Sequence, residues 1–121
     1  YNYEKVGLMM NASWAITSDK IKAAVRKIVS IEHPCRVILF GSIVRGRPDS
    51  NSDVDILVVT KDDVESPRWK SIRIRRELRG ISMPMDIPVI SEGRLKELAN
   101  RPGLIYREAL REGKVVYEAA I

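Results

Sequence analysis

The chain has 121 residues, of which 45% are apolar and 31% are charged, and its formal net charge is +5. This length and composition fit one domain with its own hydrophobic core and exclude a disordered chain. No apolar run approaches the roughly 20 residues that cross a bilayer, and no signal-peptide pattern opens the chain, so we expect a cytoplasmic protein without a membrane segment. The single cysteine and single histidine exclude a disulfide framework and a four-ligand zinc site. The basic charge favours a polyanionic partner, although a charge that serves only solubility explains it equally well.

Residues 1–17 differ in pattern from the rest of the chain. Their apolar residues, among them Leu8, Met9 and Trp14, follow no clear strand period. We interpret this segment as an N-terminal extension, an expression remnant or an arm that docks on a neighbour, and we place the domain at residues 18–121. Apolar residues in the segment allow a homo-oligomer but do not require one.

From Ser18 onward, helical and strand patterns alternate. Ser18 can cap a first helix, which the His33-Pro34 pair ends. Further helices are predicted at 67–79, 91–99 and 102–112, and strands at 37–40, 53–60, 83–90 and 114–118. Two prolines, Pro84 and Pro88, should confine the third strand to an edge or to pairing on one side. The alternation predicts one α/β or α+β domain with a mixed sheet of about four strands flanked by helices.

Two carboxylates stand at the entrance of the second strand. Asp53 and Asp55 are two residues apart, so their side chains should project to the same side, and from Val54 onward both faces of the strand are apolar. Two neighbouring like charges are costly unless a cation lies between them, and carboxylate oxygens suit Mg²⁺ or Mn²⁺. A solvated turn with Asp55 capping locally explains the pair equally well when the pair is taken alone.

A glycine-serine turn precedes this pair. Gly41 follows the apolar run of the first strand, and Ser42 stands where a short helix over 43–46 would begin. Glycine permits a sharp turn with close approach to a ligand, and backbone N–H groups at a helix N-terminus bind phosphates. A phosphate cradle beside a carboxylate pair is the arrangement that phosphoryl or nucleotidyl transfer needs.

The combined pattern, Gly-Ser, ten residues, then Asp-x-Asp, resembles the signature of the polymerase-β-like nucleotidyltransferase superfamily. The runs Gly41-Ser42-Ile43-Val44-Arg45-Gly46 and Ser52-Asp53-Val54-Asp55-Ile56-Leu57-Val58 look like those of its minimal nucleotidyltransferases (MNT type). The resemblance covers about residues 18–118. It implies the nucleotidyltransferase fold, ATP or another NTP as substrate, and Mg²⁺ as cofactor.

The resemblance also implies a third carboxylate on a neighbouring strand, for which Asp86 is the candidate. With Asp53 and Asp55, Asp86 would hold two Mg²⁺ ions and help to deprotonate the acceptor hydroxyl. The alternative is an acid in a turn. Gly41, Ser42, Arg45 and Ser52 are assigned to nucleotide binding, although Ser52 is almost equally well explained as a turn residue after Asn51.

A basic helix is predicted at residues 67–79, with six cations against one acid, Glu77. One interpretation is a platform for RNA or for an acidic protein partner. The other, which is commoner for charge runs, is a solvated face whose charge is incidental.

Two functional hypotheses follow. The first is a Mg²⁺-dependent enzyme that moves a nucleoside monophosphate, AMP from ATP in the leading case, to a hydroxyl acceptor. The family resemblance implies an acceptor on a HEPN-type partner protein in a toxin–antitoxin pair; acceptors such as aminoglycosides or nucleic-acid ends generally need a second domain, and no residue follows Ile121. The second hypothesis is a non-catalytic module of the same fold that binds a nucleotide, RNA or a protein.

Overall fold

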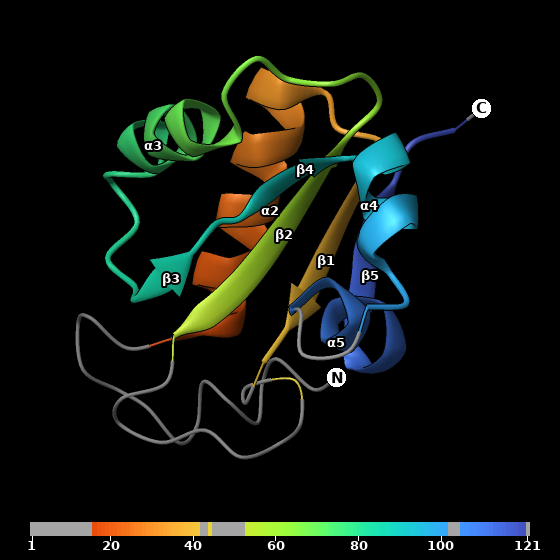
Figure 1. Ribbon diagram of the computed structural model, residues 1–121. Coiled ribbons are helices and arrows are strands. Elements are labelled where there is room, and N and C mark those ends of the chain that lie inside the picture. The colour runs from red at the N-terminus through yellow and green to blue at the C-terminus, as the bar shows by residue number, and fades with distance from the viewer. Residues whose placement is uncertain (1–15, 42–43, 45–52, 102–104, 121) are drawn as a thin grey trace.

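The computed structural model describes residues 16–41, 44, 53–101 and 105–120 (Figure 1). The helices are α2 (Ser18–Glu32), α3 (Pro67–Glu77), α4 (Glu92–Leu98) and α5 (Ile105–Glu112). The strands are β1 (Arg36–Phe40), β2 (Val54–Thr60), β3 (Met85–Asp86), β4 (Val89–Ser91) and β5 (Lys114–Glu118). These elements confirm the predicted α/β architecture with one mixed sheet.

The sheet has five strands in the order β3-β2-β1-β5, and β4 also pairs with β2. Strand β1 runs antiparallel to β2 and to β5, whereas β3 and β4 run parallel to β2. The single strand predicted over 83–90 is wrong, because that segment forms two short strands, β3 and β4, along the same neighbour. The two prolines accept hydrogen bonds from β2 through their carbonyls, Val54 N–H to Pro84 O at 3.0 Å and Val58 N–H to Pro88 O at 2.9 Å. Proline lacks only the donor, so pairing on one side survives.

Helix boundaries differ slightly from the sequence prediction. Thr17, not Ser18, caps α2, since the Thr17 hydroxyl accepts from the backbone N–H of Lys20 at 3.2 Å. Helix α2 ends at His33, whose backbone is left-handed with φ 47°. Helix α3 stops at Glu77, and residues 102–104, predicted to open the last helix, lie outside the described residues. None of the helices that the structure describes is long and apolar enough to cross a membrane.

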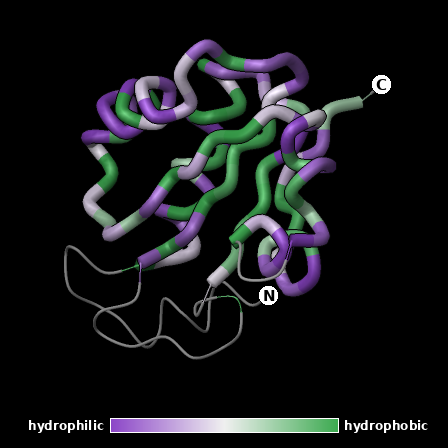
Figure 2. The backbone as a smooth tube through the Cα atoms, in the orientation of Figure 1, coloured by the Kyte–Doolittle hydropathy of each residue, from purple (hydrophilic) through white to green (hydrophobic). Residues whose placement is uncertain are grey.

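The sheet carries a hydrophobic core on each face. The larger core, under α2 and α3, contains Ile21, Ile28, Ile56, Val58 and Ile74 among its buried residues. The smaller core, under α4 and α5, contains Ile38, Phe40, Leu57, Val59, Ile90 and Leu95. Figure 2 shows the apolar colour concentrated along the central strands. Ile16, within the segment predicted as an extension, is fully buried in the larger core, and residues 1–15 lie outside the described residues.

Candidate active site

The face on which Asp55 lies follows from the alternation of β2. Ile56 and Val58 belong to the core under α2 and α3, whereas Leu57 and Val59 belong to the core under α4 and α5. Because side chains at i and i+2 of a strand share a face, Asp55 lies on the α4/α5 face, two residues before Leu57. It is half-buried in a strand whose other residues are all buried.

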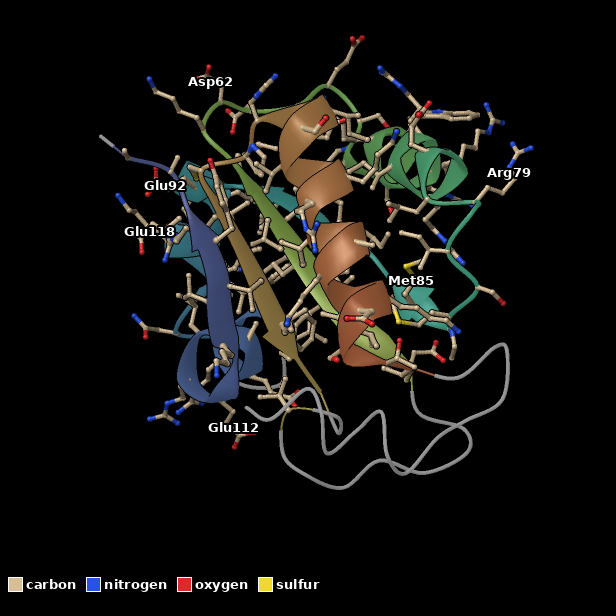
Figure 3. All side chains as sticks on the ribbon, turned by 180° about the vertical axis from the view of Figure 1, so that it is seen from behind. Asp62, Arg79, Met85, Glu92, Glu112 and Glu118 are labelled. Atoms are coloured by element: carbon tan, nitrogen blue, oxygen red, sulfur yellow. The ribbon has the colours of Figure 1, made fainter. Side chains whose placement is uncertain are left out.

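Asp86 comes from the neighbouring strand and is in register with Asp55. Strands β2 and β3 are parallel, with Val54 paired to Met85 and Asp55 paired to Asp86. Met85 packs against the core of the α2/α3 face, and Figure 3 shows it on that side, beside α2. Asp86, the next residue, therefore lies on the opposite face, where it is exposed. Backbone pairing thus brings Asp55 and Asp86 side by side on one face.

Asp53 precedes β2 and is exposed. Its spacing of two residues from Asp55 predicts the same side, but Asp53 lies outside β2, so this placement stays a prediction. These carboxylates offer only oxygen donors, which fit Mg²⁺ or Mn²⁺. Within the described part of the chain, no three His, Cys, Asp or Glu side chains are already gathered as a metal-binding group. The donor chemistry therefore fits a divalent cation, while the register places two of the three predicted ligands together.

Gly41 lies directly against Asp55. Phe40, the last residue of β1, pairs with Asp55 across the antiparallel ladder, and Gly41 then turns with φ 96°. A Cβ at Gly41 would collide with the Asp55 carboxylate and come within 3.3 Å of its Cγ. Side chains rarely adopt this φ, so both the turn and the close approach require glycine. The sharp turn predicted at Gly41 is confirmed.

The other predicted nucleotide-binding residues, Ser42, Arg45 and Ser52, lie outside the described residues, so their roles stay predictions. The predicted short helix over 43–46 is described only at Val44, which lies in a turn.

Comparison with known proteins identifies the family and the fold. The sequence profile described as "Polymerase beta, Nucleotidyltransferase" matches residues 19–120. The chain belongs to the polymerase-beta nucleotidyltransferase family. No curated protein matches the sequence. Two solved structures are similar to this nucleotidyltransferase-family chain in fold. A candidate nucleotidyltransferase from Sulfolobus solfataricus is 24% identical, with a TM-score of 0.57 over 83% of this chain and 78% of that one. A toxin–antitoxin structure with AMP-PNP is 20% identical, with a TM-score of 0.53 over 81% and 73%.

One contact beside Asp86 in this nucleotidyltransferase-family chain is not indicated by the sequence. The Ser71 hydroxyl, in the middle of α3, donates to the carbonyl of Ile87 at 2.5 Å. Ile87 directly follows Asp86 in the link between β3 and β4, so Ser71 ties that link to the helix. The only sequence signal is a small hydroxyl residue within an arginine-rich helix, which does not indicate its acceptor.

Proposed function

We propose that this protein transfers AMP from ATP to a hydroxyl group on a partner protein. The observation that carries the proposal is the pairing of Asp55 with Asp86 on the α4/α5 face, with the Gly41 turn against Asp55. Membership of the nucleotidyltransferase family supports the reaction class.

Asp53, Asp55 and Asp86 would hold Mg²⁺, and the bound metal supplies the positive charge that neutralises the triphosphate. Gly41 keeps the space beside the Asp55 carboxylate clear of side-chain atoms. The phosphates are assigned to the turn that begins at Gly41 and to Ser42, Arg45 and Ser52.

Asp86 is the proposed general base, because it is the exposed member of the registered pair. An Asp86 carboxylate oxygen accepts the proton of the acceptor hydroxyl while the acceptor oxygen bonds to the α-phosphorus. The bond between the α-phosphorus and the α,β-bridging oxygen breaks, and pyrophosphate leaves. The acceptor becomes a phosphodiester of AMP.

A protein acceptor is proposed because one similar solved structure is a toxin–antitoxin structure with AMP-PNP, an ATP analogue. We propose a HEPN-type partner for this chain on the strength of its resemblance to minimal nucleotidyltransferases.

The proposal is tested with α-labelled ATP and Mg²⁺ in the presence of proteins captured from the native host. Transfer of label should fall by about 100-fold or more in Asp55→Asn and in Asp86→Asn, since each change removes a charge from the reacting centre. Asp63→Asn is the matched control, because Asp63 is an exposed acid remote from β3 and should leave transfer within about twofold. Absence of transfer by the unmodified chain would contradict the enzyme assignment, and ATP binding retained without transfer would favour the non-catalytic module. Unchanged transfer in both site variants would mean that Asp55 and Asp86 do not carry the reaction.

A further inference from the structure

Helix α3 carries an excess of exposed arginine. Its eleven residues include five cations and one acid, Glu77. Lys70 is used within the fold, since its Nζ lies 2.7 Å from Glu32 Oε2. The four arginines of the helix are Arg68, Arg73, Arg75 and Arg76. All four are exposed, and none forms an ion pair with another residue that the structure describes. Arg94 on α4, by contrast, pairs with Glu97 at 3.0 Å. The charge on α3 is therefore left for a partner outside this part of the chain.

An exposed tryptophan shares this helix face. Trp69 is 62% exposed, although an indole is ordinarily well buried. Trp69, Arg73 and Arg76 are spaced i, i+4, i+7 and so follow one another along the helix surface. The opposite side of α3 faces the core through Ile74, which is fully buried. Trp69 thus lies among the arginines and away from the residue that holds the helix in place.

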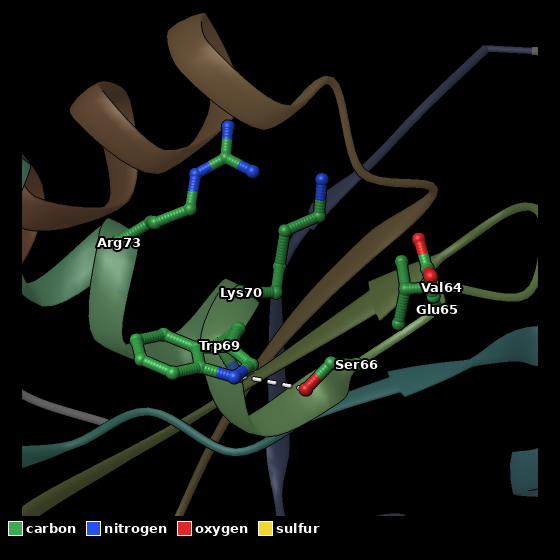
Figure 4. Close-up of a pocket in the computed structure, with 6 residues that line it drawn as sticks. All are labelled: Val64, Glu65, Ser66, Trp69, Lys70 and Arg73. Atoms are coloured by element: carbon green, nitrogen blue, oxygen red, sulfur yellow. Dashed lines mark hydrogen bonds between the residues drawn. The ribbon is translucent and has the colours of Figure 1, made fainter.

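Beside Trp69 the surface is hollowed. A depression of about 420 Å³ is lined by Val64, Glu65, Ser66, Trp69, Lys70 and Arg73. Figure 4 shows Lys70 and Arg73 extending from α3 to the same side of this hollow, and Ser66 at the start of the helix accepting from the backbone N–H of Trp69. The cap fixes the first turn, so the indole is presented from a defined backbone. Glu65, also in the lining, adds a carboxylate, which accepts hydrogen bonds.

We infer that this face, formed by Trp69 and the arginines of α3, binds single-stranded RNA. An exposed indole offers a flat surface on which an unpaired base stacks, and guanidinium groups bind the phosphates on either side. A base within a duplex cannot reach such a surface, whereas RNA regularly presents unpaired bases in loops and at ends. An acidic peptide would also pair with the arginines, but its carboxylate side chains offer no flat ring that stacks on the indole. Charge and aromatic exposure together favour RNA.

This surface is separate from the candidate active site. Helix α3 packs on one side of the sheet, whereas Asp55 and Asp86 lie on the α4/α5 side (Figure 1). RNA binding is thus a property additional to nucleotidyl transfer, and variants can affect one without the other.

The test measures binding of a fluorescein-labelled single-stranded oligouridine to the full chain by anisotropy, over a series of salt concentrations. Removing two phosphate contacts with Arg73→Gln plus Arg76→Gln should lower the slope of log K against log salt by about 1.4, since each contact on a single strand contributes about 0.7. The matched control is Arg26→Gln plus Lys27→Gln, which removes the same charge from exposed positions of α2 and should leave the slope nearly unchanged.

A second pair of variants tests the indole. Trp69→Ala should weaken binding by about fivefold or more, the lower end of measured base stacking, without changing the salt slope. Ile105→Ala, at another exposed apolar residue (45%), should leave affinity unchanged. In a Trp14→Phe background Trp69 is the only tryptophan, and its emission should be quenched on saturation with RNA.

Four results would overturn the inference. The first is an absence of saturable binding, and the second is an equal loss in the α3 and α2 charge variants. The third is unchanged affinity in Trp69→Ala with full competition by polyglutamate. The fourth is a change of affinity in Asp86→Asn, in either direction, as large as that in Trp69→Ala. The third would indicate an acidic protein partner, and the fourth would place the RNA at the carboxylates. These four results concern RNA binding only, so a failure of the proposed nucleotidyl transfer would not change any of them.

Discussion

The two faces of the sheet are built by the same strands but differ in what their side chains do. On the α2/α3 face, β2 contributes buried apolar residues along its length, from Val54 to Val58. On the α4/α5 face, β2 contributes Leu57 and Val59 to a smaller core, and the strand begins there with Asp55. On the α2/α3 face these residues of β2 are buried from Val54 onward, whereas on the α4/α5 face Asp55 is half-buried and its neighbour Asp86 is exposed.

This difference indicates how a small domain can hold charged side chains without weakening its core. Asp55 pairs through the backbone with buried Phe40 on one side and with Asp86 on the other. Its position is therefore set by main-chain hydrogen bonds, and the adjacent apolar residues supply the free energy that keeps the register. Sliding β2 by one residue would move the carboxylate into the larger core, so the register is strongly specified.

The largest expected effect is on stability, and it distinguishes a core residue from a site residue of the α4/α5 face. Leu57→Ala should lower the free energy of unfolding by about 2–5 kcal/mol, because Leu57 is fully buried in the smaller core. Asp86→Asn, on the same face but exposed, should change it by less than about 0.5 kcal/mol. Urea unfolding of both variants measures these changes. A similar loss in the two variants would mean that Asp86 is a structural residue, and the division between core and site would be wrong.

Much of the fold could be predicted because it is encoded locally. The spacing of Ile21, Ala24 and Ile28 predicts α2, and the continuous apolar run after Asp55 predicts a strand buried on both faces, as β2 is. The segment 83–90 was misread, because its apolar residues form one run in the sequence. Whether prolines interrupt a strand depends on which neighbour it pairs with, and here β2 needs only the carbonyls of Pro84 and Pro88.

The candidate site was less accessible to local reasoning. The spacing of Asp53 and Asp55 requires only strand alternation, but the position of Asp86 depends on the register of β3 with β2, a contact between residues 31 apart. Only the family resemblance pointed to Asp86. The approach of Gly41 to Asp55 and the bond from Ser71 to Ile87 depend on tertiary geometry, and no sequence period encodes either contact.

A substitution at Gly41 provides the next test of the α4/α5 face. Gly41→Ala should destabilise the fold by about 1–3 kcal/mol, because alanine is strained at φ 96°. It should reduce nucleotidyl transfer about tenfold or more, since the new methyl group collides with the Asp55 carboxylate and displaces it. Thermal unfolding and the transfer assay report the two effects separately.

Gly93→Ala is the matched control. Gly93 lies within α4 on the same side of the sheet, and a Cβ there meets nothing within 4 Å. Alanine in a helix should raise stability by about 0.5–1 kcal/mol and leave transfer unchanged. If Gly41→Ala retained full transfer, the close contact between Gly41 and Asp55 would have no functional role.

The smallest expected effect concerns Cys35, at the other end of the α4/α5 face from Asp55. Cys35 packs against the core under α4 and α5, and its thiol donates to the carbonyl of Val59 at 3.3 Å. Burial raises the pKa of the Cys35 thiol above its ordinary value, and the nearby Glu92 carboxylate raises that pKa further. The folded protein therefore keeps this proton at a pH where the unfolded chain releases it. The associated stability is fully present below the pKa of the unfolded thiol and is lost as the pH rises through the pKa of the folded one.

The rate of alkylation by iodoacetamide, followed against pH, measures this shift directly, because only the thiolate reacts. Half-maximal reactivity should occur at a higher pH in the folded protein than in urea, and Glu92→Gln should move it part of the way back. Cys35 is the only cysteine, so Cys35→Ser supplies the blank. Coincident profiles for folded and unfolded protein would mean that the Cys35 thiol is not shielded from water. The proposed difference in burial between Cys35 and the two carboxylates, Asp55 and Asp86, would then be wrong.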